Sequence, residues 1–244
     1  RHLDPANATK RGVAIAGTPA DNGMSTMELT IALILALLRK IPQVNLRMRE
    51  ELWPAVAGNT LAGKTVGVFG FGRIGKEVAR TMKAFGETRV LAYSRPLTPG
   101  RAAEAGAESA SFETLLQESD IITVHIQSNA QTRGILGEKE FAMMKRGVLL
   151  VNTARGPIVS EPAMIGALEN GRLGGVGLDV YDMEPLPMDH PLRRFDNAIL
   201  MSHRGYATVE ILSKRYDEAI HNLVDFIDGK PVQLLNPDVT PKSR

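Results

Sequence analysis

The chain has 244 residues, 43% of them hydrophobic and 23% charged, and its 29 basic and 27 acidic residues leave a formal net charge of only +2. It is long enough to bury a sizeable core, and its dispersed basic residues predict no nucleic-acid partner and no membrane-binding patch. The absence of cysteine excludes disulfides and thiolate metal sites, so we expect no metal site and a cytoplasmic location.

The predicted elements begin with a helix over residues 24–39, where apolar side chains recur at helical spacing and Pro42 follows. The predicted strands cover 65–69, 89–93, 121–124, 148–151 and 176–179, and the later helices cover 73–85, 113–117, 162–170 and 211–227. Strands that are apolar on both faces and alternate with helices are typical of a parallel sheet covered by helices. We therefore predict an α/β fold with a doubly wound Rossmann sheet, and a loose polar tail over 236–244.

A glycine-rich turn follows the first predicted strand and precedes a helix: Gly70-Phe71-Gly72-Arg73-Ile74-Gly75. The first glycine allows a tight turn, the second lets the backbone approach a diphosphate, and the third permits close packing of the helix on the strand. Free N–H groups at the start of the helix then face the anion. Because glycines at this spacing also arise by chance, the turn predicts a dinucleotide site only together with its context.

Four further motifs follow in order: Val151-Asn152-Thr153-Ala154-Arg155-Gly156, Gly177-Leu178-Asp179-Val180, Glu184-Pro185-Leu186-Pro187 and Ser202-His203-Arg204-Gly205. With the glycine turn, they make the chain resemble the D-isomer-specific 2-hydroxyacid dehydrogenases over nearly its whole length, from Arg11 to Pro237. The resemblance implies NAD(P)-dependent interconversion of a small 2-oxo acid and a D-2-hydroxy acid. It also implies two Rossmann-like domains with the active site between them.

Three residues match the family's catalytic machinery. Arg155 matches the arginine that binds the substrate, His203 the general acid/base, and Glu184 the carboxylate paired with it. The chemistry agrees, since reduction of a 2-oxo acid needs a cation for the carboxylate and an acid for the developing alkoxide. A planar guanidinium suits the carboxylate, and a nearby carboxylate favours the protonated histidine ring. The alternative is that Arg155 is a surface residue and His203 a structural one.

The end of the second predicted strand indicates which dinucleotide is bound. An NAD site places Asp or Glu about 20 residues past the glycines, but here Ser94 and Arg95 stand at that place. A serine hydroxyl and an arginine suit a 2′-phosphate, which a carboxylate would repel. We therefore expect NADP to be favoured, with NAD as the alternative if these two residues merely form a turn before Pro96.

The resemblance also implies further cofactor contacts. Thr153, Ala154 and Asp179 are expected near the nicotinamide, although Asp179 could instead cap a turn. His125 follows a strand on the cofactor side and could line the same pocket, or be structural. We expect a structural role for the remaining histidines, His2, His190 and His221.

The expected dinucleotide-binding domain covers residues 19–206, and 1–18 with 207–244 are the expected remnant of a flavodoxin-like substrate domain. The sequence starts where that domain of the family is nearly finished, so most of its N-terminal part is expected to be absent. A chain limited to these residues would bind the cofactor but catalyse poorly. Residues near the helix over 24–39, with Trp53, are expected to form a homodimer contact, as in the family.

Two departures from the family pattern bear on the function. The family usually has proline and an apolar residue around the histidine, where this chain has Ser202 and Arg204, and Arg204 could bind a second anionic group of the substrate. The family's formate enzymes usually carry glutamine where Glu184 stands, which disfavours formate oxidation but leaves phosphite oxidation open. A nucleotide-sensing, corepressor-like interaction protein on the same fold is the alternative from another functional class.

Overall fold

The computed structural model describes residues 3–18, 23–50, 52–230 and 232–239. The chain forms two compact units, one made of Arg1–Asp21 with Ala207–Arg244 and the other of Asn22–Tyr206. The predicted boundary after residue 18, the prediction for His2 and the last five residues of the predicted tail lie outside the described residues. That the smaller unit belongs to a substrate domain stays a prediction.

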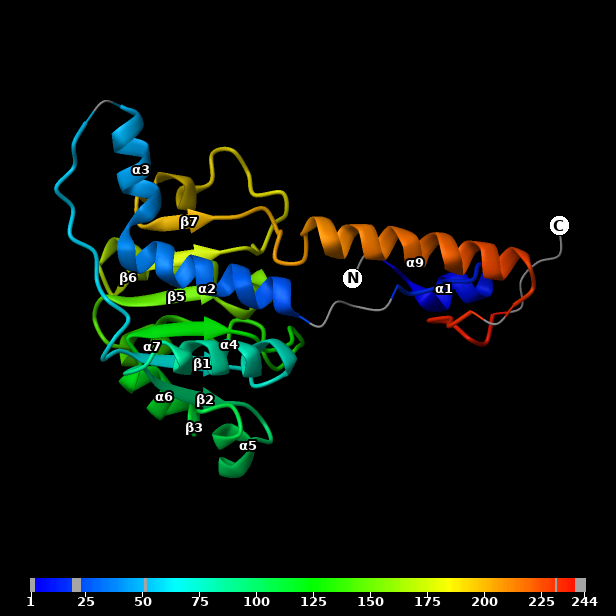
Figure 1. Cartoon of the computed structure of the whole chain (residues 1–244), viewed down its shortest axis with the longest axis horizontal. Coiled ribbons are helices and arrows are strands. Elements are labelled where there is room, and N and C mark those ends of the chain that lie inside the picture. Colours follow the sequence, from blue (N-terminus) through cyan, green and yellow to red (C-terminus); the bar gives the residue numbers. More distant parts are fainter. Residues whose placement is uncertain (1–2, 19–22, 51, 231, 240–244) are drawn as a thin grey trace. The chain divides into compact units, whose positions relative to one another are not determined.

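The larger unit is built on a seven-stranded sheet in the order β3-β2-β1-β4-β5-β6-β7, in which each paired strand is parallel to its neighbour (Figure 1). The strands are β1 (Thr65–Phe69), β2 (Arg89–Tyr93), β3 (Glu108–Ser109), β4 (Ile121–Val124), β5 (Val148–Asn152), β6 (Leu173–Leu178) and β7 (Ala198–Leu200). The strand order reverses between β1 and β4, and ligands bind doubly wound sheets at the carboxyl ends of strands beside such a point. The predicted Rossmann fold is confirmed.

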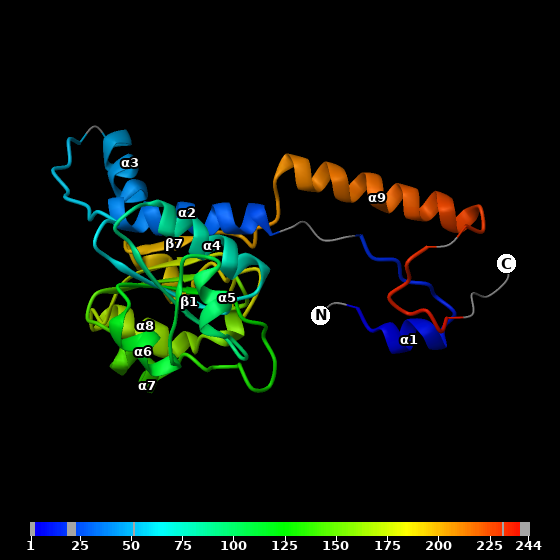
Figure 2. The same cartoon turned by 60° about the horizontal axis from the view of Figure 1, so that its bottom comes forward.

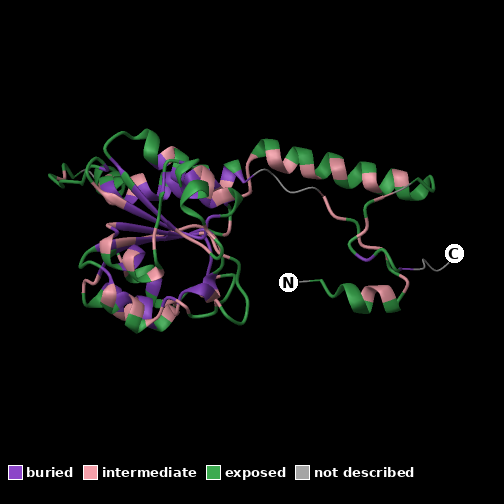
Figure 3. Ribbon diagram, turned by 90° about the horizontal axis from the view of Figure 1, so that it is seen from below, coloured by how far each residue is buried: buried purple, intermediate pink, exposed green. Residues whose placement is uncertain are grey.

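Helices cover both faces of the sheet, as Figure 2 shows. On one face lie α2 (Met24–Arg39), α4 (Arg73–Ala84) and α5 (Pro99–Ala103), and on the other lie α6 (Phe112–Glu118), α7 (Glu138–Met143) and α8 (Glu161–Glu169). Each face has its own cluster of buried apolar side chains, and the strands between them are buried on both sides (Figure 3). This explains why the strands are apolar along their whole length rather than alternating.

Glycines in β6 allow close packing against α2. A Cβ added at Gly177 would lie 3.1 Å from Cβ of Leu33, and one at Gly175 would lie 3.2 Å from Cδ2 of Leu37. A Cβ at Gly174 would lie only 2.5 Å from the carbonyl oxygen of Gly147. These glycines weaken the apolar strand pattern in the sequence, which is why β6 begins three residues before the predicted strand.

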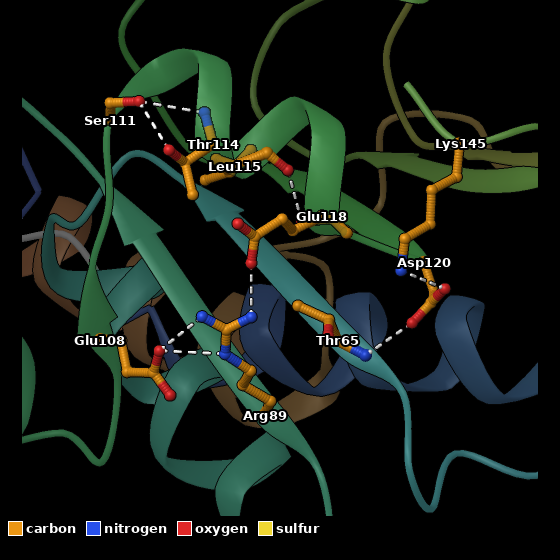
Figure 4. Close-up of polar contacts among 10 residues, drawn as sticks. Thr65, Arg89, Glu108, Ser111, Thr114, Leu115, Glu118, Asp120 and Lys145 are labelled. Atoms are coloured by element: carbon orange, nitrogen blue, oxygen red, sulfur yellow. Dashed lines mark hydrogen bonds and ion pairs between the residues drawn. The ribbon is translucent and has the colours of Figure 1, made fainter. Parts of the chain in front are cut away.

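Ion pairs gather at the amino ends of the strands, away from the carboxyl ends (Figure 4). Arg89, the first residue of β2, donates to the carboxylates of Glu108 and Glu118. Asp120, which precedes β4, accepts from Lys145 at 2.8 Å and from the backbone N–H of Thr65 at 2.8 Å. The partly exposed pairs of Arg89 join β2 to β3 and α6, and the contacts of Asp120 join the start of β4 to β1 and to Lys145 before β5, at the edge opposite the ligand edge.

Helix α3 (Ile41–Arg49) directly follows α2 and was not predicted. Lys40, in a left-handed conformation with φ +52°, ends α2 and precedes α3. Pro42 lies in the first turn of α3, where the missing N–H of proline costs no hydrogen bond. Among the described residues no single helix is long and apolar enough to cross a membrane, and the one bent pair that passes by length and composition is α2 with α3. Half of the residues of α2 are buried in the core of the larger unit.

The smaller unit contains α1 (Pro5–Lys10) and α9 (Val209–Ile227). Asn236 joins its two segments, because its side chain accepts from the N–H of Ile15 at 2.8 Å and donates to the carbonyl of Val13 at 2.9 Å. Helix α9 buries none of its residues within the described structure (Figure 3). Two of its large apolar side chains, Ile220 and Leu223, are more than half exposed.

Candidate active site

The glycine turn connects β1 to α4 and is shaped by close backbone contacts. Gly70 has φ +105°, and a Cβ there would lie 2.5 Å from the backbone carbon of His125. A Cβ at Gly75 would lie 2.0 Å from the carbonyl oxygen of Gly70, so any side chain would push the helix off the strand. At Gly72, by contrast, an added Cβ meets no atom within 4 Å. The turn is thus closed toward the sheet and open on the side from which a diphosphate would approach.

The turn forms one wall of a cavity of about 640 Å³ at the carboxyl ends of β1, β2 and β4. Ser94 and Arg95 line it, and Arg95 Nε donates to the hydroxyl of Tyr93 at 3.0 Å. His125 also lines it, with Nε2 2.7 Å from Oγ1 of Thr123. Burial lowers the pKa of His125 to about 3, so this ring is neutral at physiological pH and cannot serve as a cationic anchor.

Arg155 lies in the loop after β5, and Asn152 shapes that loop. The side chain of Asn152 donates to the carbonyl of Arg155 at 2.9 Å and accepts from the N–H of Ala154 at 3.0 Å. A Cβ at Gly156 would lie 2.0 Å from the carbonyl carbon of Tyr181, so the loop packs directly on the chain that follows β6. These contacts leave the side chain of Arg155 exposed, with one Nη donating to the carbonyl of Ala154.

His203 and Glu184 form a hydrogen-bonded pair. Nδ1 of His203 lies 2.7 Å from Oε2 of Glu184, and the other carboxylate oxygen accepts from the N–H of Tyr181 at 3.0 Å. Burial raises the pKa of Glu184, but the hydrogen bonds from His203 and Tyr181 and the charges of His203 and Arg155 outweigh it and hold that pKa below its ordinary value. The carboxylate is therefore ionised near neutral pH and faces two cationic or donor groups.

Asp179 holds the loop that carries His203. It follows β6 directly, is 1% exposed, and accepts from the N–H groups of Arg204 at 2.7 Å and Gly205 at 2.8 Å. His203 itself has φ +57°, an unfavourable conformation for a residue with a side chain. Both carboxyl oxygens of Asp179 are thus occupied in fixing the backbone immediately after this strained residue.

A second cavity, of about 560 Å³, lies beside the pair. His203, Glu184 and Arg193 contribute its polar groups, while Leu186 and Met201 are among its apolar ones. Tyr181 lies at its wall with the hydroxyl donating to the carbonyl of Met201 at 2.7 Å. The site therefore combines a hydrogen-bonded histidine–carboxylate pair with a partly apolar cavity large enough for a small organic molecule.

A match to a known family model identifies the family to which this chain belongs. The sequence model of the "D-isomer specific 2-hydroxyacid dehydrogenase, NAD binding domain" matches residues 31–205. The chain belongs to this dehydrogenase family. The resemblance predicted from the five motifs is therefore confirmed.

Individual members of the dehydrogenase family are similar over most of this chain. The D-3-phosphoglycerate dehydrogenase of Bacillus subtilis is 40% identical over 95% of the chain, which spans only 44% of that protein. The glyoxylate reductase of Thermococcus litoralis is 38% identical over 99% of the chain and 76% of the relative. The crystal structure of a D-lactate dehydrogenase from Aquifex aeolicus, complexed with NAD and lactic acid, has a TM-score of 0.79 at 30% identity, covering 93% and 73% of the two chains.

Within this dehydrogenase fold, the predicted site residues divide into two groups. Gly70, Gly72, Ser94, Arg95 and His125 line the larger cavity. Glu184 and His203 line the smaller one, and the charge of Arg155 acts on Glu184. Their predicted roles in binding and catalysis stay predictions.

Other predicted cofactor residues have different surroundings. Phe71 is buried in the apolar core rather than turned to a cavity. The Thr153 hydroxyl lies 2.9 Å from that of Thr30 in α2, and the N–H of Ala154 is taken by Asn152. Arg73 is exposed at the first position of α4, and Ile74 packs against the core.

Sequence reasoning missed two residues that line the smaller cavity, and one contact of a histidine to which it gave a structural role. Tyr181 closes the wall of the smaller cavity, Arg193 reaches it from the turn before β7, and His190 pairs with Glu161 at 2.9 Å. Tyr181 directly follows the motif that ends at Val180, and Arg193 lies between two motifs, so no motif pointed to either residue. His190 was assigned a structural role. The short pattern Asp189-His190-Pro191 is a turn signal, but nothing in it reveals a partner on α8.

Proposed function

We propose that the chain binds a nicotinamide dinucleotide and reduces a small 2-oxo acid to a D-2-hydroxy acid. One observation carries the proposal. His203 is hydrogen-bonded to the ionised carboxylate of Glu184, and the charge of Arg155 acts on the same carboxylate. This group lies at the carboxyl ends of the strands of a dinucleotide-binding sheet, where ligands bind. Hydride transfer to a 2-oxo acid needs this combination of an acid, a carboxylate partner and a cation.

His203 is the proposed general acid, and Glu184 its positioning partner. Because Nδ1 of His203 faces Oε2 of Glu184 at 2.7 Å, the hydrogen on Nδ1 belongs to this pair, and Nε2 is the nitrogen left to exchange a proton with the substrate oxygen. The ionised Glu184 stabilises the protonated ring before transfer. In the reverse direction the neutral ring accepts the hydroxyl proton.

Arg155 is the proposed substrate anchor. Its side chain is exposed beside the pair, and its guanidinium can donate two parallel hydrogen bonds to a carboxylate. A cation at this place would also polarise the 2-oxo group as negative charge develops on it.

The larger cavity is the proposed dinucleotide site. Gly72 would admit the diphosphate, Gly70 and Gly75 would shape the turn that holds it, and a bound nicotinamide would supply the hydride. The fit of the turn is supported by the open side of Gly72. Ser94 and Arg95 favour NADP, since both line the cavity without a carboxylate at the end of β2.

The experiment compares kcat/KM with NADPH and NADH across small 2-oxo acids, including phosphorylated ones, and with phosphite. We expect turnover of a 2-oxo acid and a preference for NADPH, because Arg95 would pair with the 2′-phosphate. A preference of about tenfold for NADH would contradict the choice of cofactor, since one lost charge-assisted hydrogen bond corresponds to about that factor. Oxidation of phosphite without reduction of any 2-oxo acid would contradict the reaction.

We further propose a homodimer that acts in the cytoplasm. Residues after α2 expose several large apolar side chains, with Trp53 89% exposed and Leu46 and Ile41 more than half exposed. Exposed apolar side chains that gather on a surface mark a site of protein–protein contact. Sedimentation equilibrium tests the proposal, and a monomer at micromolar concentration would refute it.

A further inference from the structure

The two members of the proposed acid pair lie on different loops. His203 lies in the loop that Asp179 holds from β6. Glu184 lies in the segment 182–190, which runs from Tyr181 to the short helix η2 (Pro191–Arg194). The distance between the pair therefore depends on how the 182–190 segment is held.

Arg193 contacts the backbone of that segment twice. Its Nε donates to the carbonyl of Pro187 at 2.8 Å, and its Nη2 donates to the carbonyl of Leu186 at 2.9 Å. These carbonyls lie two and three residues beyond Glu184. A guanidinium holds its donors in a fixed plane, so the two bonds fix the orientation of the backbone at Leu186 and Pro187 as well as its distance from Arg193.

His190 holds the far end of the same segment. Its Nε2 lies 2.9 Å from Oε1 of Glu161 at the start of α8, and its Nδ1 accepts from the N–H of Leu192 at 3.3 Å. An accepting Nδ1 leaves the hydrogen on Nε2, which then donates to Glu161. Leu192 is fully buried in the core, which anchors η2 and with it Arg193.

Besides the contacts of Arg193 and His190, the 182–190 segment is held by Leu186, which packs against the core, and by the N–H of Tyr181, which donates to Glu184. Met183 is 65% exposed and Met188 is 85% exposed, so neither side chain anchors the segment in the core. The charges that act on the pKa of Glu184 are those of His203 and Arg155. Arg193 therefore acts on Glu184 through the backbone that it holds, while its charge acts on the neighbouring Tyr181.

We infer that Arg193 is a positioning residue for the proposed acid pair: its two hydrogen bonds, with the His190–Glu161 contact as a second tether, hold Glu184 within hydrogen-bond distance of His203. This inference rests on the proposed function for its catalytic consequence, but not for its structural part. Arg193 touches no reacting atom in this role.

Arg193→Gln and Arg194→Gln form a matched pair for the test. Both remove one positive charge from η2, and both side chains start from exposed residues, so each variant is expected to fold. Within the described structure, Arg193 alone of the two is seen to bond the 182–190 segment. Arg193→Lys keeps the charge but cannot reproduce the planar fork.

The first measurement is amide hydrogen exchange on the full chain, which needs no activity. Arg193→Gln is expected to speed exchange by about tenfold or more at Tyr181, whose N–H donates to Glu184, and at His190, whose N–H donates to the carbonyl of Pro187, because loss of charge-assisted hydrogen bonds permits local opening. Arg194→Gln should match the wild type, Arg193→Lys should resemble Arg193→Gln, and His190→Ala should speed exchange at Leu192, whose N–H donates to Nδ1 of His190. Unchanged exchange in Arg193→Gln, or wild-type exchange in Arg193→Lys, would overturn the inference.

The second measurement is steady-state kinetics with a substrate that the wild type turns over. Arg193→Gln is expected to lower kcat by about tenfold, with the dissociation constant of the cofactor unchanged, because the pair is lost while the glycine turn is intact. Faster exchange with unchanged kcat would overturn the positioning role. If the wild type reduces no 2-oxo acid, the proposed function fails, and the exchange data still decide whether Arg193 holds the segment.

Discussion

Replacing Asp179 by asparagine separates two roles for this buried residue. The resemblance to the family predicts a contact near the nicotinamide, whereas the structure shows both carboxyl oxygens accepting backbone N–H groups, from Arg204 at 2.7 Å and Gly205 at 2.8 Å. Asparagine has nearly the same shape but only one acceptor oxygen, and its amide group would face one of the two N–H donors.

The cost follows from those two bonds. A hydrogen bond to a charged group contributes about 1.5–3 kcal/mol, and a buried donor left without a partner costs about 1–3 kcal/mol. Asp179→Asn keeps one bond and leaves one donor unsatisfied, so we expect the free energy of unfolding to fall by about 2–3 kcal/mol. The strained backbone of His203, with φ +57°, then relaxes away from the pair.

Urea unfolding, calorimetric titration with NADPH and steady-state kinetics measure the three consequences. We expect lower stability, kcat reduced by about tenfold or more, and an NADPH dissociation constant within about threefold of the wild type. Asp196→Asn is the control, because this side chain is exposed on the same unit. A tenfold weaker NADPH affinity with unchanged stability would refute the anchoring role and favour the direct cofactor contact.

Two other substitutions test the geometry of the site and its response to pH. Gly156→Ala adds a Cβ that would lie 2.0 Å from the carbonyl carbon of Tyr181, so thermal unfolding should show a free energy of unfolding lower by about 3 kcal/mol or more. Gly166→Ala on α8 is the control: its Cβ would meet nothing within 4 Å, so the free energy of unfolding should rise by about 0.5–1 kcal/mol. Equal effects of the two substitutions would contradict the contact at Gly156. Because the pKa of Glu184 is held below 4.5 in the folded state, its ionisation stabilises the fold above that pH and the contribution is lost as pH falls through the lowered pKa. Urea unfolding from pH 7 to 3 should therefore show a shallower loss in Glu184→Gln than in the wild type, and parallel curves would contradict the paired carboxylate.

Much of the fold follows from the sequence because the sheet is parallel and buried. Strands β1, β2 and β4 coincide with their predicted ranges, since short apolar runs of this length between turn residues are typical of buried strands. Strand β7 was missed because it is short and only half-buried, so its pattern is weak. Helix α3 was missed because Pro42, which ends a helical pattern in most contexts, here stands in a first turn.

The site is predictable where a motif fixes the local backbone and not where two distant segments meet. The glycine turn, Arg155, Glu184 and His203 were found because their neighbours form spacings that belong to the family. The contacts of Arg193 with the segment that carries Glu184, and of His190 with Glu161, depend on where η2 and α8 lie in the fold. No local pattern in the sequence encodes that placement.

The most direct test of the central claim follows the hydride itself. The purified chain is incubated with a 2-oxo acid and NADPH that carries deuterium on the nicotinamide carbon that donates the hydride, and the product is analysed by chiral chromatography with mass spectrometry. Our account predicts deuterium at the carbinol carbon of the D-2-hydroxy acid, and little or none with His203→Ala although this variant still binds NADPH. Absence of labelled product, or equal labelling with His203→Ala, would contradict the account.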